Sequence, residues 1–238
     1  MTDILISDLH LDEARPDLTA GFLKFLDSGL DDADSLYILG DFFEVWLGDD
    51  HHTAFNQSII DALSALTLPI YFMHGNRDFL IGQDFCQAVG ATLLPDPSIV
   101  ELANEPVLLM HGDSLCTGDV EYMKVRQMLR NPAVQQDLLG KSLEERAAIA
   151  RQARGDSKAH TRETAADIMD VTPSEVVAVM QEAGVKTLIH GHTHRPATHQ
   201  VELADGQQGQ RIVLGDWDRL GWRLVAGESG FTLESFEL

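Results

Sequence analysis

Short apolar runs alternate with helical patterns along this chain, and that alternation constrains its fold more than any other feature. The runs at residues 3–7, 35–39 and 69–73 are rich in the aliphatic, β-branched and aromatic residues that favour strands. Between them, residues 18–26 and 55–66 repeat apolar side chains three and four positions apart, which predicts helices. Strands that alternate with helices are typical of βαβ units around a parallel sheet.

The rest of the chain departs from this pattern in two places. Further strand-like runs at 105–110 and 186–190 flank residues 119–170, which have no strand pattern, are rich in Ala, Gln, Arg and Glu, and contain the capping-box sequence SLEE at Ser142. We therefore predict a helical insertion at 119–170, and both a lid over the site and a surface decoration remain open. From residue 201 onward, closely spaced short runs and Gly- or Asp-containing turns predict antiparallel β structure.

Length and composition limit the class of protein. A chain of 238 residues with 44% hydrophobic content is long enough for one α/β domain over residues 1–238, including the insertion. Cys86 and Cys116 lack metal-ligand spacing, which favours buried apolar roles in a reducing compartment. No apolar run approaches the roughly 20 residues of a membrane span, and the first residues do not resemble a secretion signal. We therefore expect a cytoplasmic protein.

The charge is strongly acidic, with 38 acidic and 17 basic residues and a formal net charge of -21. Such a field repels polyanions and provides no basic footprint, so nucleic acid is not an expected partner. The acidic residues are spread along the whole chain, which favours a solvated surface over a dedicated site. The sequence predicts no protein partner.

Five short motifs follow the ends of predicted strands. They are SDLH at 7–10, GDFFE at 40–44, GNRD at 75–78, HGD at 111–113 and GHTH at 191–194. In open α/β sheets, the loops at the carboxyl ends of the strands line one crevice, so side chains distant in sequence converge there. The candidate ligands from these motifs are Asp8, His10, Asp41, Asn76, His111, His192 and His194.

The combination of these side chains is more informative than any one of them. Alone, His111 is compatible with a structural histidine, and Asp41 with a turn residue. Together, four imidazoles with oxygen donors suit Mn²⁺, Fe²⁺ or Zn²⁺ better than Mg²⁺ or Ca²⁺. Two such ions about 3.5–4 Å apart need a bridging group, and Asp41 is the candidate. The histidines outside the motifs, which are His51, His52, His74, His160, His190 and His199, are interpreted as structural.

The motif set resembles that of the calcineurin-like metallophosphoesterases, and the resemblance spans residues 7–195. It implies a four-layer αββα sandwich and a water nucleophile whose pKa two divalent ions lower. The resemblance assigns Asp8, His10, Asp41 and His194 to one ion. It assigns Asp41, Asn76, His111 and His192 to the other.

One motif departs from the family pattern, because Arg77 follows Gly75 and Asn76 where the family has a histidine. An arginine does not release its proton near neutral pH, so Arg77 is expected to bind a phosphate as a fixed cation. A pyrophosphate suits this change, since a departing phosphate needs little help from a general acid.

Longer motifs at 40–50, 75–82, 168–173 and 188–196 resemble one branch of the family, the enzymes of lipid A biosynthesis that hydrolyse a lipid-linked UDP-sugar. This resemblance implies attack by water on the α-phosphate of UDP-2,3-diacylglucosamine, giving UMP and 2,3-diacylglucosamine 1-phosphate (lipid X). The implied cofactor is two Mn²⁺ ions. The insertion would hold the acyl chains, and the lipid substrate implies peripheral contact with the cytoplasmic face of the inner membrane.

The resemblance also implies which side chains contact the substrate. These are Asn76, Arg77, Asp119, Ser157, Thr161, Thr164 and His192. Lys158 or Arg162 is an alternative source of the polar contacts that Thr161 and Thr164 would make. Any attraction to anionic lipid would need a local basic patch, for which Lys124, Arg126 and Arg130 are the candidates.

Two other functions remain open. The first is a metallophosphoesterase that acts on a soluble nucleotide pyrophosphate or phosphodiester, against which Arg77 and the insertion argue. The second is a scaffold of the same fold without catalysis, which the complete set of seven ligand types disfavours.

Overall fold

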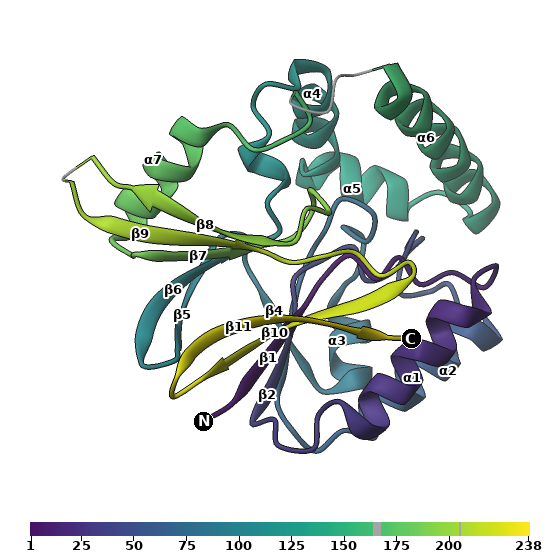
Figure 1. Ribbon diagram of the computed structural model, residues 1–238. Helices are drawn as coiled ribbons and strands as arrows, with labels where there is room; N and C mark the ends of the chain where they lie inside the picture. Colours follow the sequence, from purple (N-terminus) through teal and green to yellow (C-terminus); the bar gives the residue numbers. More distant parts are fainter. Residues whose placement is uncertain (164–167, 205) are drawn as a thin grey trace.

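The computed structural model describes residues 1–163, 168–204 and 206–238, which form two stacked β-sheets with helices on the outside (Figure 1). The first sheet has the order β11-β10-β1-β2-β3-β4 and the second β5-β6-β7-β9-β8. The strands of the first sheet are β1 (Asp3–Ile6), β2 (Ser35–Ile38), β3 (Ile70–Met73), β4 (Ala91–Leu94), β10 (Leu220–Gly227) and β11 (Gly230–Glu237). Those of the second are β5 (Ser98–Leu102), β6 (Glu105–Met110), β7 (Thr187–His190), β8 (Ala197–Glu202) and β9 (Gln208–Val213).

Helices cover the outer faces of both sheets. Helices α1 (Pro16–Ser28), α2 (Ala54–Ser64) and α3 (Gln83–Val89) pack on the first sheet, and α7 (Pro173–Ala183) packs on the second (Figure 1). One apolar cluster lies under the first three helices, one lies between the sheets, and one lies under α7. The four-layer αββα architecture implied by the sequence resemblance is therefore confirmed.

Three further helices lie together beyond the ends of the sheets. Helices α4 (Val120–Leu129), α5 (Pro132–Leu139) and α6 (Leu143–Glu163) form this group, here called the cap, inside the stretch predicted to be an insertion (Figure 1). The predicted capping box is confirmed. The backbone N–H of Ser142 donates to Oε2 of Glu145 over 2.9 Å, and the N–H of Glu145 donates to the Ser142 hydroxyl over 3.3 Å.

The prediction of antiparallel structure for the last quarter is partly wrong. Strand β9 pairs with β8 antiparallel but with β7 parallel, and β10 and β11 belong to the other sheet. Local spacing indicates strands but contains no information about which edge a strand joins, because pairing depends on distant segments. Among the described residues, no helix is long and apolar enough to cross a membrane.

Candidate metal centre

The seven candidate ligands come from loops that follow parallel strands. Asp8 and His10 follow β1, Asp41 follows β2, and the chain reaches Asn76 just after β3. In the second sheet, His111 follows β6, and His192 and His194 follow β7. Strands β1, β2 and β3 run parallel to one another, as do β6 and β7. The carboxyl ends of each set lie at one edge of its sheet, which brings these side chains together.

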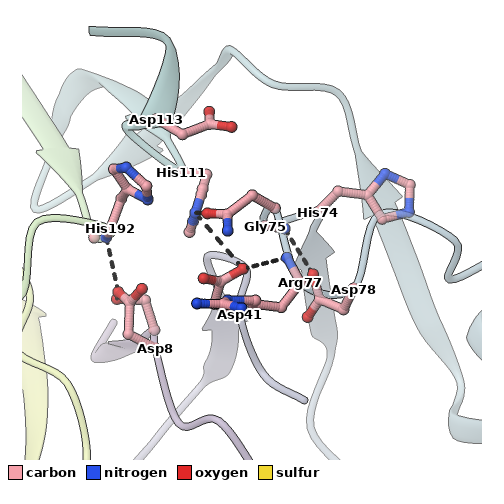
Figure 2. A network of polar contacts seen from close by, with 12 residues as sticks. Asp8, Asp41, His74, Gly75, Arg77, Asp78, His111, Asp113 and His192 are labelled. Atoms are coloured by element: carbon pink, nitrogen blue, oxygen red, sulfur yellow. Dashed lines mark hydrogen bonds and ion pairs between the residues drawn. The ribbon is translucent and has the colours of Figure 1, made fainter. Parts of the chain in front are cut away.

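Two groups of donors result. In the first, the ligand atoms of Asp8, His10 and His194 all lie within 4.8 Å of one another. In the second, those of Asp41, His111 and His192 meet the same limit. Oδ1 of Asn76 lies 3.1 Å from Nε2 of His111 and so joins the second group. The structure thus gathers the seven predicted side chains in two adjacent sets, and the backbone N–H of His192 donates a hydrogen bond to the carboxylate of Asp8 (Figure 2).

The backbone at these positions is strained. Asp8, His10, Asp41, His192 and His194 all have positive φ, between 50° and 65°. A residue with a Cβ in this left-handed region costs on the order of 1–3 kcal/mol, and such residues concentrate at functional sites. The clustering therefore indicates a geometry that the surrounding structure imposes.

Close packing around the ligand loops explains the glycines of the motifs. A Cβ on Gly75 would lie 2.1 Å from the backbone nitrogen of Asp41, and one on Gly191 would lie 2.2 Å from Oδ2 of Asp8. Neither loop can move away without moving a candidate ligand. The glycines in GNRD and GHTH are therefore required by the approach of two loops.

Asp8 presents one free oxygen to the first group. Its Oδ2 accepts hydrogen bonds from the hydroxyl of Ser7 at 2.5 Å and from the N–H of His192 at 2.9 Å (Figure 2). Its Oδ1 is buried without a hydrogen-bond partner, 3.4 Å from Nε2 of His194. The Nε2 atoms of His10 and His194 lie 3.3 Å apart. Because a buried carboxylate oxygen needs a partner, this arrangement fits a cation held between an oxygen and two ring nitrogens.

The Nδ1 atoms of three histidines, on the side of each ring away from the centre, contact oxygen atoms. Nδ1 of His10 lies 3.0 Å from Oε2 of Glu44, and Nδ1 of His194 lies 3.5 Å from Oδ2 of Asp216. Nδ1 of His111 donates to the carbonyl oxygen of Leu39 over 2.9 Å. Such partners orient metal-binding imidazoles and determine which nitrogen carries the proton. They leave Nε2 of each ring available toward the centre.

Asp41 lies against the loop that follows β3, which contains Gly75, Asn76 and Arg77. Its Oδ1 accepts a hydrogen bond from the N–H of Arg77 at 2.8 Å and lies 3.8 Å from Nε2 of His111 (Figure 2). Buried Asp78 accepts hydrogen bonds from the N–H groups of Gly75 and Phe42. It therefore joins the loop after β3 to the loop after β2. Burial and the charge of Asp41 together raise the pKa of Asp78 to about 6.

The pKa values show that positive charge is favoured in this centre. Burial opposes protonation of His111, but Asp41, Asp113 and Asp8 raise its pKa to about 9. Burial likewise opposes protonation of His194, yet the hydrogen bond and charge of Asp8 raise its pKa to about 9. Burial and the neighbouring His111 lower the pKa of His192 to about 4. Divalent cations satisfy the same demand for positive charge, so the residues present fit a dinuclear metal centre.

A cavity of about 420 Å³ opens beside the centre, between the ligand loops and the cap. Its polar part includes Asn76, Arg77 and Asp113. Much of the remaining wall is apolar, and includes Trp46, Leu80, Met128, Leu138, Ile149 and Ala150. The cavity thus has both charged and apolar walls, and helices α4, α5 and α6 contribute to the apolar part.

The predicted substrate contacts are distributed unevenly around this cavity. Asn76, Arg77 and Ser157 line it. Asp119 instead caps helix α4, where its carboxylate accepts from the N–H of Tyr122 at 3.0 Å. Thr164 lies outside the described residues, as do the side chains of Thr161, Lys158 and Arg162.

Sequence reasoning assigned no role to four acidic residues around the centre. Glu44, Asp78 and Asp113 lie inside the quoted motifs, and Asp216 follows Gly215 just after strand β9. The Gly-Asp pair after a strand end, as in Gly40 and Asp41, was the available signal for Asp216. By contrast, two histidines outside the motifs make backbone contacts, His74 to the carbonyl of Ile81 and buried His190 to that of Gly191.

Comparisons with known proteins agree with this geometry. A protein named UDP-2,3-diacylglucosamine hydrolase from Pseudomonas fluorescens (strain SBW25) is 58% identical over 98% of this chain and 95% of its own length. A protein of the same name from Stutzerimonas stutzeri (strain A1501) is 56% identical over 99% of both chains. The solved structure of an archaeal phosphodiesterase has a TM-score of 0.51 at 14% identity, covering 99% of this chain and 100% of its own, which shows a shared fold alone.

The family assignment follows from the extent of the match. The sequence model of the calcineurin-like phosphoesterases matches residues 1–196, which contain all seven candidate ligands. Hydrolases of this family use divalent metal ions, and the two donor groups occupy the matched region. This chain belongs to the calcineurin-like phosphoesterase family.

Proposed function

We propose that this chain hydrolyses the pyrophosphate bond of UDP-2,3-diacylglucosamine, giving UMP and 2,3-diacylglucosamine 1-phosphate (lipid X) in lipid A biosynthesis. The observation that carries the proposal is the cavity, whose lining combines Asn76 and Arg77 of the ligand loop after β3 with apolar side chains of the cap. A substrate with a diphosphate and fatty acyl chains matches these two environments. The names and near-complete coverage of the relatives support it.

In the proposed mechanism, Asp8, His10, Asp41 and His194 would hold one divalent ion. Asp41, Asn76, His111 and His192 would hold the other, so Asp41 would serve both. When bound, the ions lower the pKa of a water molecule and offset the charge of the phosphates. Water attacks the α-phosphorus, the bond from that phosphorus to the bridging oxygen breaks, and lipid X departs. The donors, imidazoles and oxygens without thiolates, suit Mn²⁺, Fe²⁺ or Zn²⁺, and we take Mn²⁺ because the resemblance to the lipid A branch of the family implies it.

Arg77 acts in this scheme as a fixed cation on the diphosphate. Its backbone N–H binds Asp41, and the residue also lines the cavity. A guanidinium forms two parallel hydrogen bonds with a phosphate and keeps its proton near neutral pH. It therefore orients the diphosphate without protonating the leaving group.

The cap is proposed to receive the acyl chains as a lid formed by residues 119–170. Val125 and Met128 of helix α4 line the cavity and are still 46% and 52% exposed, so one helix reaches both the cavity and its surface. Ser157 lines the wall on α6, where a hydroxyl suits the polar head of the lipid.

Peripheral contact with the cytoplasmic face of the inner membrane is part of the proposal. Each of the basic residues considered for a lipid-binding patch, Lys124, Arg126 and Arg130, has an acidic neighbour. Arg126 lies 3.0 Å and Arg130 3.6 Å from Asp113, while Lys124 pairs with Glu121. The arginines turn inward because Asp113 is buried and charged. The exposed apolar side chains of α4 are therefore the proposed contact with the membrane. Sedimentation of the protein with anionic liposomes tests this contact. Protein that stays wholly in the supernatant contradicts the proposed membrane contact.

The reaction itself is tested with Mn²⁺-loaded protein and UDP-2,3-diacylglucosamine in oxygen-18 water. Mass spectrometry is expected to find the label in UMP, because the α-phosphorus accepts the water oxygen. Label in lipid X would place the attack on the other phosphorus. Hydrolysis of bis-p-nitrophenyl phosphate and diadenosine tetraphosphate is measured in parallel. Faster turnover of these soluble compounds would overturn the proposed substrate.

A further inference from the structure

Glu44 contacts both a candidate metal ligand and the cap. Its Oε2 lies 3.0 Å from Nδ1 of His10, and its Oε1 accepts a hydrogen bond from Nη2 of Arg154 at 2.5 Å. Arg154 belongs to helix α6 and lies 110 residues further along the chain. One carboxylate therefore joins a ligand loop of the first sheet to the longest helix of the cap.

The environment of Glu44 favours a charged carboxylate that can serve both partners. Its side chain is 16% exposed and that of Arg154 is 29% exposed, so both are partly shielded from water. The two oxygens of Glu44 face different partners, Nδ1 of His10 and Nη2 of Arg154, and the guanidinium of Arg154 offsets the charge of the carboxylate. A charged carboxylate with two different partners on its two oxygens transmits a change at one partner to the other.

We propose that Glu44 is a positioning residue that orients His10 for its metal ion and at the same time holds helix α6, so that metal loading and cap closure favour each other. An imidazole of His10 restrained by an ion would keep Glu44 aligned, with one oxygen toward His10 and the other toward Arg154. The metal-free protein would sample this contact with α6 less of the time. The inference rests on the metal centre of the proposed function, and it does not depend on the substrate.

The same helix provides a matched control. Arg146, eight residues before Arg154, donates to both carboxylate oxygens of Asp50, at 2.7 and 2.5 Å, and to the carbonyl of Leu47. It therefore also holds α6 to the body of the protein. None of these partners is a candidate ligand, and no contact printed for Asp50 in the described chain reaches one of the seven. Loss of Arg146 loosens the cap without acting through His10.

The first test is hydrogen–deuterium exchange of the full chain, metal-free and with saturating Mn²⁺. Mn²⁺ is expected to slow amide exchange in residues 146–157 several-fold. Arg154→Gln is expected to remove most of this Mn²⁺-dependent difference. Arg146→Gln is expected to speed exchange in both states and leave the difference intact. A difference that survives in Arg154→Gln, or that is lost equally in Arg146→Gln, would overturn the proposal.

The second test is calorimetric titration of the metal-free protein with Mn²⁺. Loss of a group that orients a ligand lowers metal affinity by about 10–100-fold, so Glu44→Gln is expected to weaken one of the two sites by that factor. Because coupling between two sites is reciprocal, Arg154→Gln is expected to weaken the same site by a smaller factor, and Arg146→Gln to leave it unchanged. Unchanged Mn²⁺ affinity of both sites in Glu44→Gln would contradict the proposal.

Two further comparisons keep the result unambiguous. Glu44→Asp retains the charge but shortens the side chain, which moves the carboxylate away from His10. It is therefore expected to weaken Mn²⁺ binding at the same site as Glu44→Gln does. Wild-type affinity in both variants contradicts the inference. Both tests use Mn²⁺ alone. If they succeed while UDP-2,3-diacylglucosamine is not hydrolysed, the proposed substrate fails and the coupling stands. If Mn²⁺ does not bind the wild-type chain, both fail together.

Discussion

The hydroxyl of Tyr122 donates a hydrogen bond to Oδ2 of Asp113 over 3.2 Å, and this contact fastens the first helix of the cap to the loop that follows His111. Nε of Arg126 lies 3.0 Å from the same oxygen, and Nη2 of Arg130 reaches the carbonyls of His74 and Gly75. Burial opposes ionisation of Asp113, but His111, His192 and the two arginines hold its pKa below its usual value. A charged, buried carboxylate therefore anchors α4.

Asp113→Asn is expected to destabilise the protein, because the variant removes the carboxylate that lies 3.0 Å from Arg126 of α4 and 3.6 Å from Arg130, the residue that caps this helix. Breaking a buried ion pair by removing one member costs about 3–5 kcal/mol. Urea unfolding followed by tryptophan fluorescence measures the free energy of unfolding. Glu121→Gln is the matched control, since it removes the exposed ion pair with Lys124 on the same helix, which is worth at most about 1 kcal/mol. Equal losses in the two variants would contradict the anchoring role.

Asp41→Asn is expected to abolish turnover and tight metal binding. A bridging carboxylate contributes to both metal positions, and its amide analogue has neither the charge nor two equivalent oxygens. Metal analysis by mass spectrometry is expected to find about two ions per wild-type chain and fewer in the variant. Asp137→Asn, which removes an exposed ion pair with Lys141, serves as the control and should keep its metal. Full activity of Asp41→Asn would refute the bridge.

Binding of Mn²⁺ is expected to release protons near neutral pH. In the metal-free centre His111 and His194 have pKa values of about 9, above their ordinary value of 6.5, so both rings carry a proton at pH 7. A metal ion needs the free lone pair of a neutral ring, so binding displaces these protons and becomes tighter as pH rises toward 9.

The displaced protons are counted by titration calorimetry in buffers of different ionisation enthalpy. Release of about two protons per chain is expected at pH 7, falling toward zero above roughly pH 10. His194→Ala should release about one proton fewer. A metal affinity that does not change between pH 7 and pH 9 would argue against the raised pKa values.

Ala150→Phe is expected to change acyl-chain preference, because Ala150 lies on α6 and lines the apolar part of the cavity. The larger ring occupies space proposed for a fatty acyl chain. A lost apolar contact of this kind is worth about 1–3 kcal/mol, so kcat/KM for a long-chain substrate should fall at least about 10-fold. Activity on a short-chain analogue should change much less.

Ala148→Phe places the same ring on the exposed side of the helix and is the control for this experiment. It should leave the ratio of long-chain to short-chain activity unchanged. Equal losses on both substrates in Ala150→Phe would place the acyl chains elsewhere.

The ligand set was predictable from the sequence because each motif follows a short apolar run. Each motif follows the carboxyl end of a predicted strand. The strands of βαβ units run parallel, so the loops after their carboxyl ends lie at the same edge of the sheet. The residues Asp8, Asp41 and His111 illustrate this, since each lies within three residues of a strand's carboxyl end. The capping box at Ser142 was predictable for a similar reason, because its contacts are local.

Other features depend on contacts between distant segments. The spacing of residues 208–213 indicates a strand, but its parallel pairing with β7 depends on packing between the sheets. Arg126 and Arg130 resemble a surface patch in sequence, and only the position of buried Asp113 turns them inward. The roles of Glu44 and Asp216 likewise depend on where the rings of His10 and His194 lie.

By itself, the sequence predicted the fold class, the candidate donors and their positions at strand ends, because short-range periodicity, strand direction and the motif set carry that information. Tertiary structure alone decided which carboxylates contact the donor rings and how the cap is fixed over the cavity. These features arise from the approach of loops that lie up to 184 residues apart, as Asp8 and His192 do. Burial and charge at such contacts depend on the packed fold.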